Sequence, residues 1–179
     1  ANPEELVATV AQSPVMLGAS FTYQVSTAKS YVIAASGQKK ATCVAVDFGI
    51  KSMTPQLLSQ RGIEVHVVNA NTSWEEIAAL KPNGIFLSNG PGDPASAVDA
   101  VGLVQKALKA KMPLFGICFG NQILGRALGL DTYKMQYGHR GINQPVKDLT
   151  TGKIEITAHN HGVAVRAPNS REFDTPFGR

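Results

Sequence analysis

Cys118 lies between two glycines in the stretch 115–122, FGICFGNQ. The order Gly-x-Cys-x-Gly has the form of a nucleophile elbow, with cysteine in the place of serine. Because a sharp turn from strand to helix crowds the backbone, we expect side chains at positions 116 and 120 to clash. The turn would expose the sulfur at the N-terminus of a helix, whose partial positive charge favours thiolate over thiol. The pattern therefore predicts that Cys118 is a nucleophile with a lowered pKa.

The alternative is a cysteine that only ends a core strand, because cysteine often packs as a small apolar residue. We assign that role to Cys43, which lies inside the apolar run TCVAV. For Cys118 the two flanking glycines favour the nucleophile.

A second glycine-rich loop, SNGPGDP at 88–94, could supply the electrostatic help that an attacking thiolate needs. Acyl transfer places negative charge on an oxygen, and preorganised backbone N–H groups stabilise that charge. Gly92 offers one such N–H, and Phe119, directly after the cysteine, offers another. Asp93 and Pro94 also read as an ordinary helix cap, but a cap does not explain the NGPG segment.

A cysteine nucleophile needs a base, usually a histidine. His66 lies in an apolar strand, and we interpret it as structural. His139 lies in a turn-rich loop, where packing or a partner contact is the simpler role. His159 and His161, in AHNHG, are better candidates because they follow an expected strand. The residues alone do not choose among them.

The composition excludes several classes of protein. The 179 residues suit one domain, and the net charge of +4 is scattered, which does not favour nucleic-acid binding. Two cysteines make no disulfide framework, and no Cys/His cluster has zinc spacing, so we expect no metal site. No segment has the length and apolarity of a membrane span, and the N-terminus lacks the pattern of a signal peptide. We therefore expect no membrane partner and a cytoplasmic location.

Strand and helix patterns alternate four times from residue 41. This alternation predicts an α/β fold with an open, mostly parallel sheet and helices on both faces. Ser73 and Glu76 have capping-box spacing, Thr54 could cap the first helix, and Asp93 could cap the third. The expected strands are 42–48, 63–69, 84–88 and 113–118, and the expected helices are 54–62, 73–80, 93–111 and 120–129.

The two ends of the chain have different patterns. After Gly129 we expect short strands at 132–136, 142–148, 153–158 and 162–167, added at one end of the sheet. At the start we expect a short helix that Pro14 stops, an extended segment at 21–33 and a linker at 34–40. Residues 1–40 would then connect a separate N-terminal domain to a domain formed by residues 41–179.

Four motifs together resemble the class I glutamine amidotransferases, whose sheet is of the flavodoxin or Rossmann type. They are FLSNGPGDP, PLFGICFGNQILGRALG, YGHRGINQPV and HNHGVAV. Within that family the motifs are most similar to the small, glutamine-hydrolysing chains of carbamoyl-phosphate synthetase. The resemblance extends over nearly the whole chain from about residue 41.

The resemblance implies a reaction and a set of site residues. Cys118 would attack the side-chain amide of glutamine, release ammonia and form a glutamyl thioester that water hydrolyses. The backbone N–H groups of Gly92 and Phe119 would form the oxyanion hole. The glutamine-binding residues would be Gly90, Gly92, Phe119, Gln122, Asn160, Gly162 and Val163. The family commonly has an aromatic residue at the position of Val163 and leucine at that of Phe119.

The resemblance also implies a partner. Ammonia would pass to a large synthetase subunit that uses ATP and bicarbonate to make carbamoyl phosphate for pyrimidine and arginine synthesis. We expect no cofactor in this chain, because ATP and metal ions would bind the large subunit.

One departure matters for the mechanism. The family takes its base and orienting acid from a later His-Pro-Glu motif, which does not occur in these 179 residues. We therefore expect a domain that is incomplete at its C-terminal part, and a chain that is a poor glutaminase by itself. The alternatives are a non-catalytic docking module of the synthetase, an amidotransferase of another pathway such as anthranilate or guanine nucleotide synthesis, and a redox-sensing cysteine protein.

Overall fold

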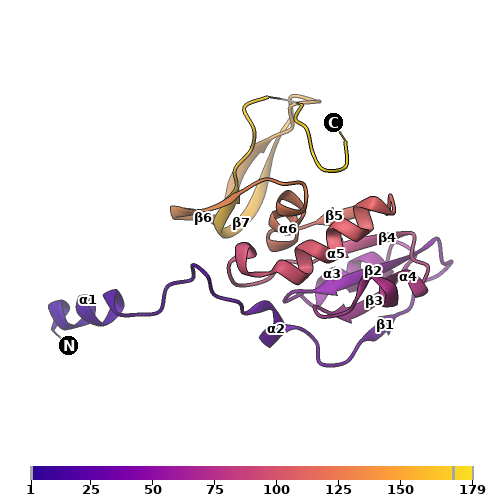
Figure 1. The fold of residues 1–179 in the computed structure, drawn as a ribbon, viewed down its shortest axis with the longest axis horizontal. Helices are drawn as coiled ribbons and strands as arrows, with labels where there is room; N and C mark the ends of the chain where they lie inside the picture. Colours follow the sequence, from indigo (N-terminus) through magenta and orange to yellow (C-terminus); the bar gives the residue numbers. More distant parts are fainter. Residues whose placement is uncertain (1, 171, 179) are drawn as a thin grey trace.

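The structure is a computed structural model that describes residues 2–170 and 172–178. Residues 1, 171 and 179 lie outside this description. The first belongs to the expected linker 1–40, and the other two belong to the expected domain 41–179. A five-stranded sheet forms the centre of the molecule, in the order β1-β3-β2-β4-β5 (Figure 1). Its strands are β1 (Tyr31–Ile33), β2 (Ala41–Asp47), β3 (Ile63–Asn69), β4 (Gly84–Leu87) and β5 (Leu114–Gly116). All neighbours are parallel except β1, which runs antiparallel to β3.

Helices cover both faces of this sheet, as the alternating pattern predicts. Successive residues of β2 point to opposite faces, and Val44 belongs to one buried cluster while Ala45 belongs to the other. The first cluster includes residues of α4 (Trp74–Ala79), α5 (Val98–Lys109) and α6 (Phe119–Ala127). The second is closed by α3 (Met53–Ser59), through Leu58. The predicted fold class, an open and mostly parallel α/β sheet, is confirmed.

Two of the predicted helix starts agree with the structure and one does not. Ser73 and Glu76 form both hydrogen bonds of a capping box at the start of α4. Asp93 caps a short 3-10 helix, η1 (Pro94–Ser96), so the single helix expected at 93–111 is divided into η1 and α5. The prediction that Thr54 caps the first helix is wrong, because α3 begins at Met53 and Ser52 is the residue before it.

The expectation of four short strands added to the sheet after Gly129 is wrong. Residues 132–165 form instead a separate antiparallel hairpin of two long strands, β6 (Thr132–Lys147) and β7 (Ile154–Val165). Register shifts between residues 134 and 139 and between 141 and 144 let β6 continue past Gly138 and Gly141, which both have positive φ. The hairpin rises beside the central sheet, with α6 between them (Figure 1).

The N-terminal segment also differs from its extended prediction. Residues 22–25 form a helical turn, α2 (Thr22–Val25), and only Tyr31–Ile33 are extended, as the edge strand β1. The helix α1 (Pro3–Ala11), expected before Pro14, has no buried residue and lies away from the body of the molecule (Figure 1). Within the described residues, no helix has the length and apolar character that crossing a bilayer requires.

Candidate active site

Cys118 lies at the sharp turn between β5 and α6, with φ of 52° and ψ of −108°. A side chain on either flanking glycine would collide with backbone. A Cβ on Gly116 would lie 2.6 Å from the carbonyl carbon of Gly120, and a Cβ on Gly120 would lie 2.2 Å from the carbonyl oxygen of Leu87. The predicted reason for the two glycines is therefore confirmed, and the backbone has the strained geometry of a nucleophile elbow.

The surroundings of the Cys118 sulfur oppose the predicted lowering of its pKa. Burial raises the pKa of the thiol, while the backbone N–H of Phe119 and the charge of Lys51 act in the other direction. Burial is the largest of these effects, so the expectation of a lowered pKa is wrong. The thiol donates a hydrogen bond to the backbone oxygen of Asn160, at 3.9 Å. The sulfur is therefore mainly a thiol at neutral pH, and it needs a base for attack.

The glycine-rich loop after β4 is held close to the loop after β2. The hydroxyl of Ser88 accepts a hydrogen bond from the N–H of Phe48, and the Asn89 amide donates to the carbonyl of Gly49. Gly90 packs so tightly that a Cβ there would lie 2.1 Å from the Phe48 carbonyl oxygen. These contacts fix the backbone of the loop at the carboxyl edge of the sheet, where open α/β proteins bind ligands.

Gly92 lies where this loop meets the N-terminal segment. Its φ is +105°, and a Cβ would lie 2.8 Å from the carbonyl oxygen of Ala19. Asp93 fixes the same contact, because its N–H donates to Ala19 and its carboxylate accepts from the N–H of Gly18. Among the hydrogen bonds between described residues, none uses the N–H of Gly92. That N–H is thus available to a ligand.

A cavity of about 930 Å³ opens between these loops and the hairpin. The structure brings nearly all of the predicted site residues to its wall, although they come from the loop after β4, from the elbow, from α6 and from β7. The predicted residues that line it are Gly90, Gly92, Cys118, Gln122, Asn160, Gly162 and Val163. The exception, Phe119, is 1% exposed and packs against Phe48, so only its backbone can face the site.

Gln122 connects α6 to the hairpin. Its side-chain amide is buried and donates a hydrogen bond of 2.6 Å to the carbonyl of Val163. Gly125, one turn later, packs against Val165, where a Cβ would come within 2.9 Å. The side chain of Gln122 thus holds β7 against α6, whereas the resemblance implies a contact with substrate.

Three cationic side chains that were not among the predicted site residues also line the cavity. They are Lys51, Lys134 and Arg140. Lys51 could have been found, because it follows β2 at the carboxyl edge of the sheet. Lys134 and Arg140 carry no such signal, since they reach the site only through the hairpin. Arg140 donates to the side-chain oxygen of Asn160 at 3.1 Å.

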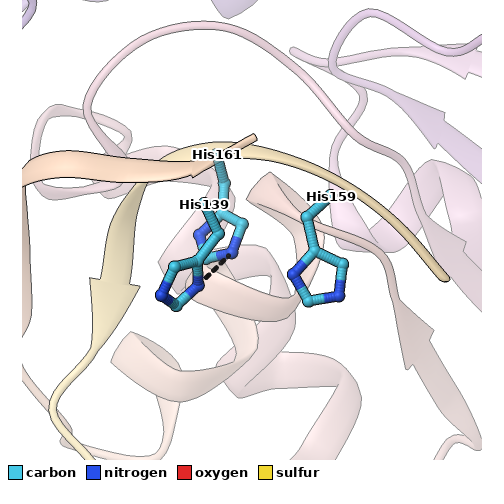
Figure 2. A group of neighbouring side chains, drawn as sticks. All are labelled: His139, His159 and His161. Atoms are coloured by element: carbon cyan, nitrogen blue, oxygen red, sulfur yellow. Dashed lines mark hydrogen bonds between the residues drawn. The ribbon is translucent and has the colours of Figure 1, made fainter. Parts of the chain in front are cut away.

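The histidines differ from their predicted places. His139 is in β6 and not in a loop, and His159 and His161 are inside β7 and do not follow a strand. The three lie together on the hairpin (Figure 2). Among the described residues, no histidine is hydrogen-bonded to the Cys118 sulfur. His66 is in β3, as expected, and its Nε2 lies 3.1 Å from a carboxylate oxygen of Glu64.

Comparison with known proteins identifies the family. The family model "Glutamine amidotransferase class-I" matches residues 44–175. A carbamoyl phosphate synthase small chain of Streptomyces avermitilis is 57% identical over the whole of this chain, and the match covers 48% of that protein. The protein of the same name from Mycobacterium tuberculosis is 53% identical over 99% of this chain and 48% of its own length. The chain thus spans about half the length of these curated relatives.

Solved structures agree in fold. A glutamine amidotransferase from Thermotoga maritima matches with a TM-score of 0.55 and 17% identity, over 76% of this chain and 68% of that one. A glutamine amidotransferase from Methylobacillus flagellatus matches with a TM-score of 0.54 and 15% identity, over 74% of this chain and 59% of that one. The family model covers most of the chain, including the elbow and the glycine-rich loop. The chain therefore belongs to the class I glutamine amidotransferase family.

Proposed function

We propose that this chain is the glutamine-hydrolysing part of a carbamoyl phosphate synthase small chain. The observation that carries the proposal is Cys118, held in a strained elbow at the wall of the cavity that gathers the predicted site residues. The relatives at 53–57% identity carry that name. Within the family, they favour this branch over an amidotransferase of another pathway.

The proposed reaction proceeds through a thioester. The Cys118 sulfur bonds to the amide carbon of the glutamine side chain, and its proton leaves with the departing nitrogen as ammonia once the carbon–nitrogen bond breaks. Negative charge on the oxygen of the tetrahedral intermediate is stabilised by the N–H groups of Gly92 and Phe119. Water then attacks the thioester carbon, which gives glutamate and restores the thiol.

The cavity suits the amino-acid end of glutamine. Lys51, Lys134 and Arg140 give its wall positive charge, which complements an α-carboxylate. Asn160 and Gly162 present backbone groups from β7, opposite the glycine-rich loop. Glutamine would therefore extend from the hairpin towards Cys118, with its amide carbonyl facing Gly92.

The 179-residue polypeptide, tested by itself, should turn glutamine over slowly. Its thiol has a raised pKa, and the sequence contains no His-Pro-Glu to remove the proton. General acid–base catalysis contributes about 10²–10⁴-fold to such reactions. In the complete enzyme, ammonia would pass to a large subunit that carries ATP, metal ions and bicarbonate.

Release of glutamate and ammonia from glutamine tests the proposal. We expect the polypeptide to be about 10²–10⁴-fold slower than a complete small chain, and Cys118→Ser to remove the remaining turnover. Equal turnover by the wild-type and Cys118→Ser polypeptides would contradict the role of the thiol. Turnover at the rate of a complete small chain would contradict the need for the missing base.

A further inference from the structure

Three histidines from the two strands of the hairpin converge on one point. His139 in β6 is the register partner of His161 in β7, and His159 lies two residues before His161, on the same face of that strand. The residue opposite His159 is Gly141, so no side chain competes with its ring. One nitrogen from each ring lies within 4.8 Å of the other two, and Figure 2 shows the three rings facing one another.

The hydrogen bonds of His161 leave one ring nitrogen bare. Its Nδ1 lies 2.9 Å from the carbonyl oxygen of Val163, which can only accept, so Nδ1 carries the proton. The other nitrogen, Nε2, therefore carries no proton, and it accepts a hydrogen bond from Nδ1 of His139, 3.2 Å away. A histidine that donates one N–H to a backbone carbonyl and presents the other nitrogen is arranged as metal-binding histidines are.

The hydrogen bonds of His159 also fix which of its ring nitrogens carries the proton. Its Nε2 lies 2.9 Å from the hydroxyl oxygen of Thr157, and that hydroxyl gives its own proton to the carbonyl of Gln144, at 3.0 Å. Nε2 must then be the donor, and Nδ1 of His159 is bare. In Figure 2 one nitrogen of His159 faces the other two rings and the other nitrogen faces away.

The spacing matches a tetrahedral ion. Zinc–nitrogen bonds of about 2.0–2.1 Å at tetrahedral angles place two ligand nitrogens about 3.3 Å apart. His139 and His161 are already at 3.2 Å, so an ion could replace the proton between them once His139 carries its proton on Nε2. The nitrogen of His159, which lies within 4.8 Å of the other two, would move closer to them on binding. Alternation along the strands turns the cationic Arg140 to the opposite face.

We propose that His139, His159 and His161 form a site for one late first-row divalent cation, represented by Zn²⁺. Imidazole nitrogens are ligands that this class of ion prefers. His139 is exposed and the other two are partly so, which leaves a fourth position open to water. The site does not depend on the proposed glutaminase activity.

Zinc titration of the folded 179-residue polypeptide by calorimetry tests the site. We expect one Zn²⁺ per chain. Each of His139→Ala, His159→Ala and His161→Ala should lower the affinity at least about 100-fold, because loss of a ligand costs more than the roughly 10–100-fold typical of a residue that only supports a ligand. Thr157→Val removes the hydroxyl that orients His159 and that also bonds to the Gln144 carbonyl, and it should lower the affinity about 10–100-fold. His66→Gln, a histidine outside the cluster, and Cys118→Ser should retain the affinity.

A second measurement uses the unaltered chain, so it does not depend on whether the variants fold. Added Co²⁺ should give the intense visible absorption bands of a tetrahedral ion, and Zn²⁺ should remove them. Binding that survives all three alanine substitutions, binding lost in Cys118→Ser, or Co²⁺ that shows only the weak bands of the hydrated ion would each overturn the proposal.

Discussion

At the scale of the residue, the backbone at Cys118 explains why glycine stands on both sides of it. A non-glycine residue with φ of 52° costs about 1–3 kcal/mol, and the structure around it must enforce that conformation. Gly116 and Gly120 enforce it, because they let α6 approach β4 and β5 more closely than any side chain would allow. The strain exposes a thiol to the cavity where a core cysteine would be covered.

A pair of glycine substitutions tests this explanation. Gly120→Ala places a Cβ 2.2 Å from the Leu87 carbonyl oxygen, and the free energy of unfolding should fall by about 3 kcal/mol. Gly102→Ala in α5 meets no atom within 4 Å, and it should raise that free energy by about 0.5–1 kcal/mol because alanine favours the helix. Urea denaturation measures both. Equal effects of the two substitutions would show that Gly120 is not in a crowded turn.

The pH dependence of alkylation tests the state of the thiol. Burial raises the pKa of Cys118, so its thiolate forms only at higher pH, and its reaction with iodoacetamide should have a midpoint above the value of about 8.5 for a free cysteine. Burial raises the pKa of Cys43 to about 11, so Cys43 should react more slowly at every pH below that value. Peptide mass spectrometry separates the two sites. A Cys118 midpoint below that of free cysteine would contradict the effect of burial.

At the scale of the element, the hairpin β6–β7 decides whether the site is complete. Two side-chain hydrogen bonds between described residues join α6 to the hairpin: Gln122 donates to the carbonyl of Val163 in β7, and Arg126 donates to the hydroxyl of Thr132 in β6. Only the first of them is buried. Asn160, Gly162, His159 and His161 line the cavity, and all four are in β7, which is fixed at this point.

Loss of that link should loosen the hairpin. Gln122→Ala leaves the Val163 carbonyl without its buried donor, which should cost about 1–3 kcal/mol. Amide hydrogen exchange in β7 should quicken, while exchange in β2 should not change. Gln136→Ala is the matched control, because that exposed amide bonds only to the neighbouring Tyr137. Unchanged protection of β7 in Gln122→Ala would show that other contacts hold the hairpin.

The sequence predicts the central sheet well and the hairpin poorly, for a physical reason. Buried parallel strands such as Ala41–Asp47 are short apolar runs between helix signals, and the local pattern is enough to find them. The hairpin strands are largely exposed, and their irregular register at Gly138 and Gly141 breaks the alternation into apparent short strands. Cys118 and the loop 88–94 can be recognised in the sequence because each is a local motif. The cluster of His139, His159 and His161 cannot, because it forms only when β6 pairs with β7.

At the scale of the whole molecule, exposed apolar side chains gather on two regions outside the central sheet. One is the N-terminal segment, and the other is the hairpin, where Ile142 is 87% exposed and Ile154 and Ile156 are each 66% exposed. Apolar patches of this kind mark surfaces that other proteins cover. The large subunit proposed above, bound to these regions, would account for such surfaces.

The isolated polypeptide should therefore self-associate. Light scattering should show a mean mass that rises with protein concentration, and Ile142→Ser combined with Ile154→Ser and Ile156→Ser should reduce the rise. These side chains are exposed, so the triple variant should keep its fold by circular dichroism. A strictly monomeric wild-type chain over the whole range would count against the exposed hairpin as an association surface.

The central claim, that Cys118 is the nucleophile of a glutamine site, is tested most directly by labelling with a glutamine-like electrophile such as a diazo-ketone analogue. Mass spectrometry of the unaltered chain should find the adduct on Cys118 and not on Cys43. An excess of glutamine should slow the labelling, whereas an equal excess of lysine, whose side chain is cationic and has no amide, should not. Labelling of Cys43 at an equal rate, or labelling of Cys118 that glutamine does not slow, would contradict the account.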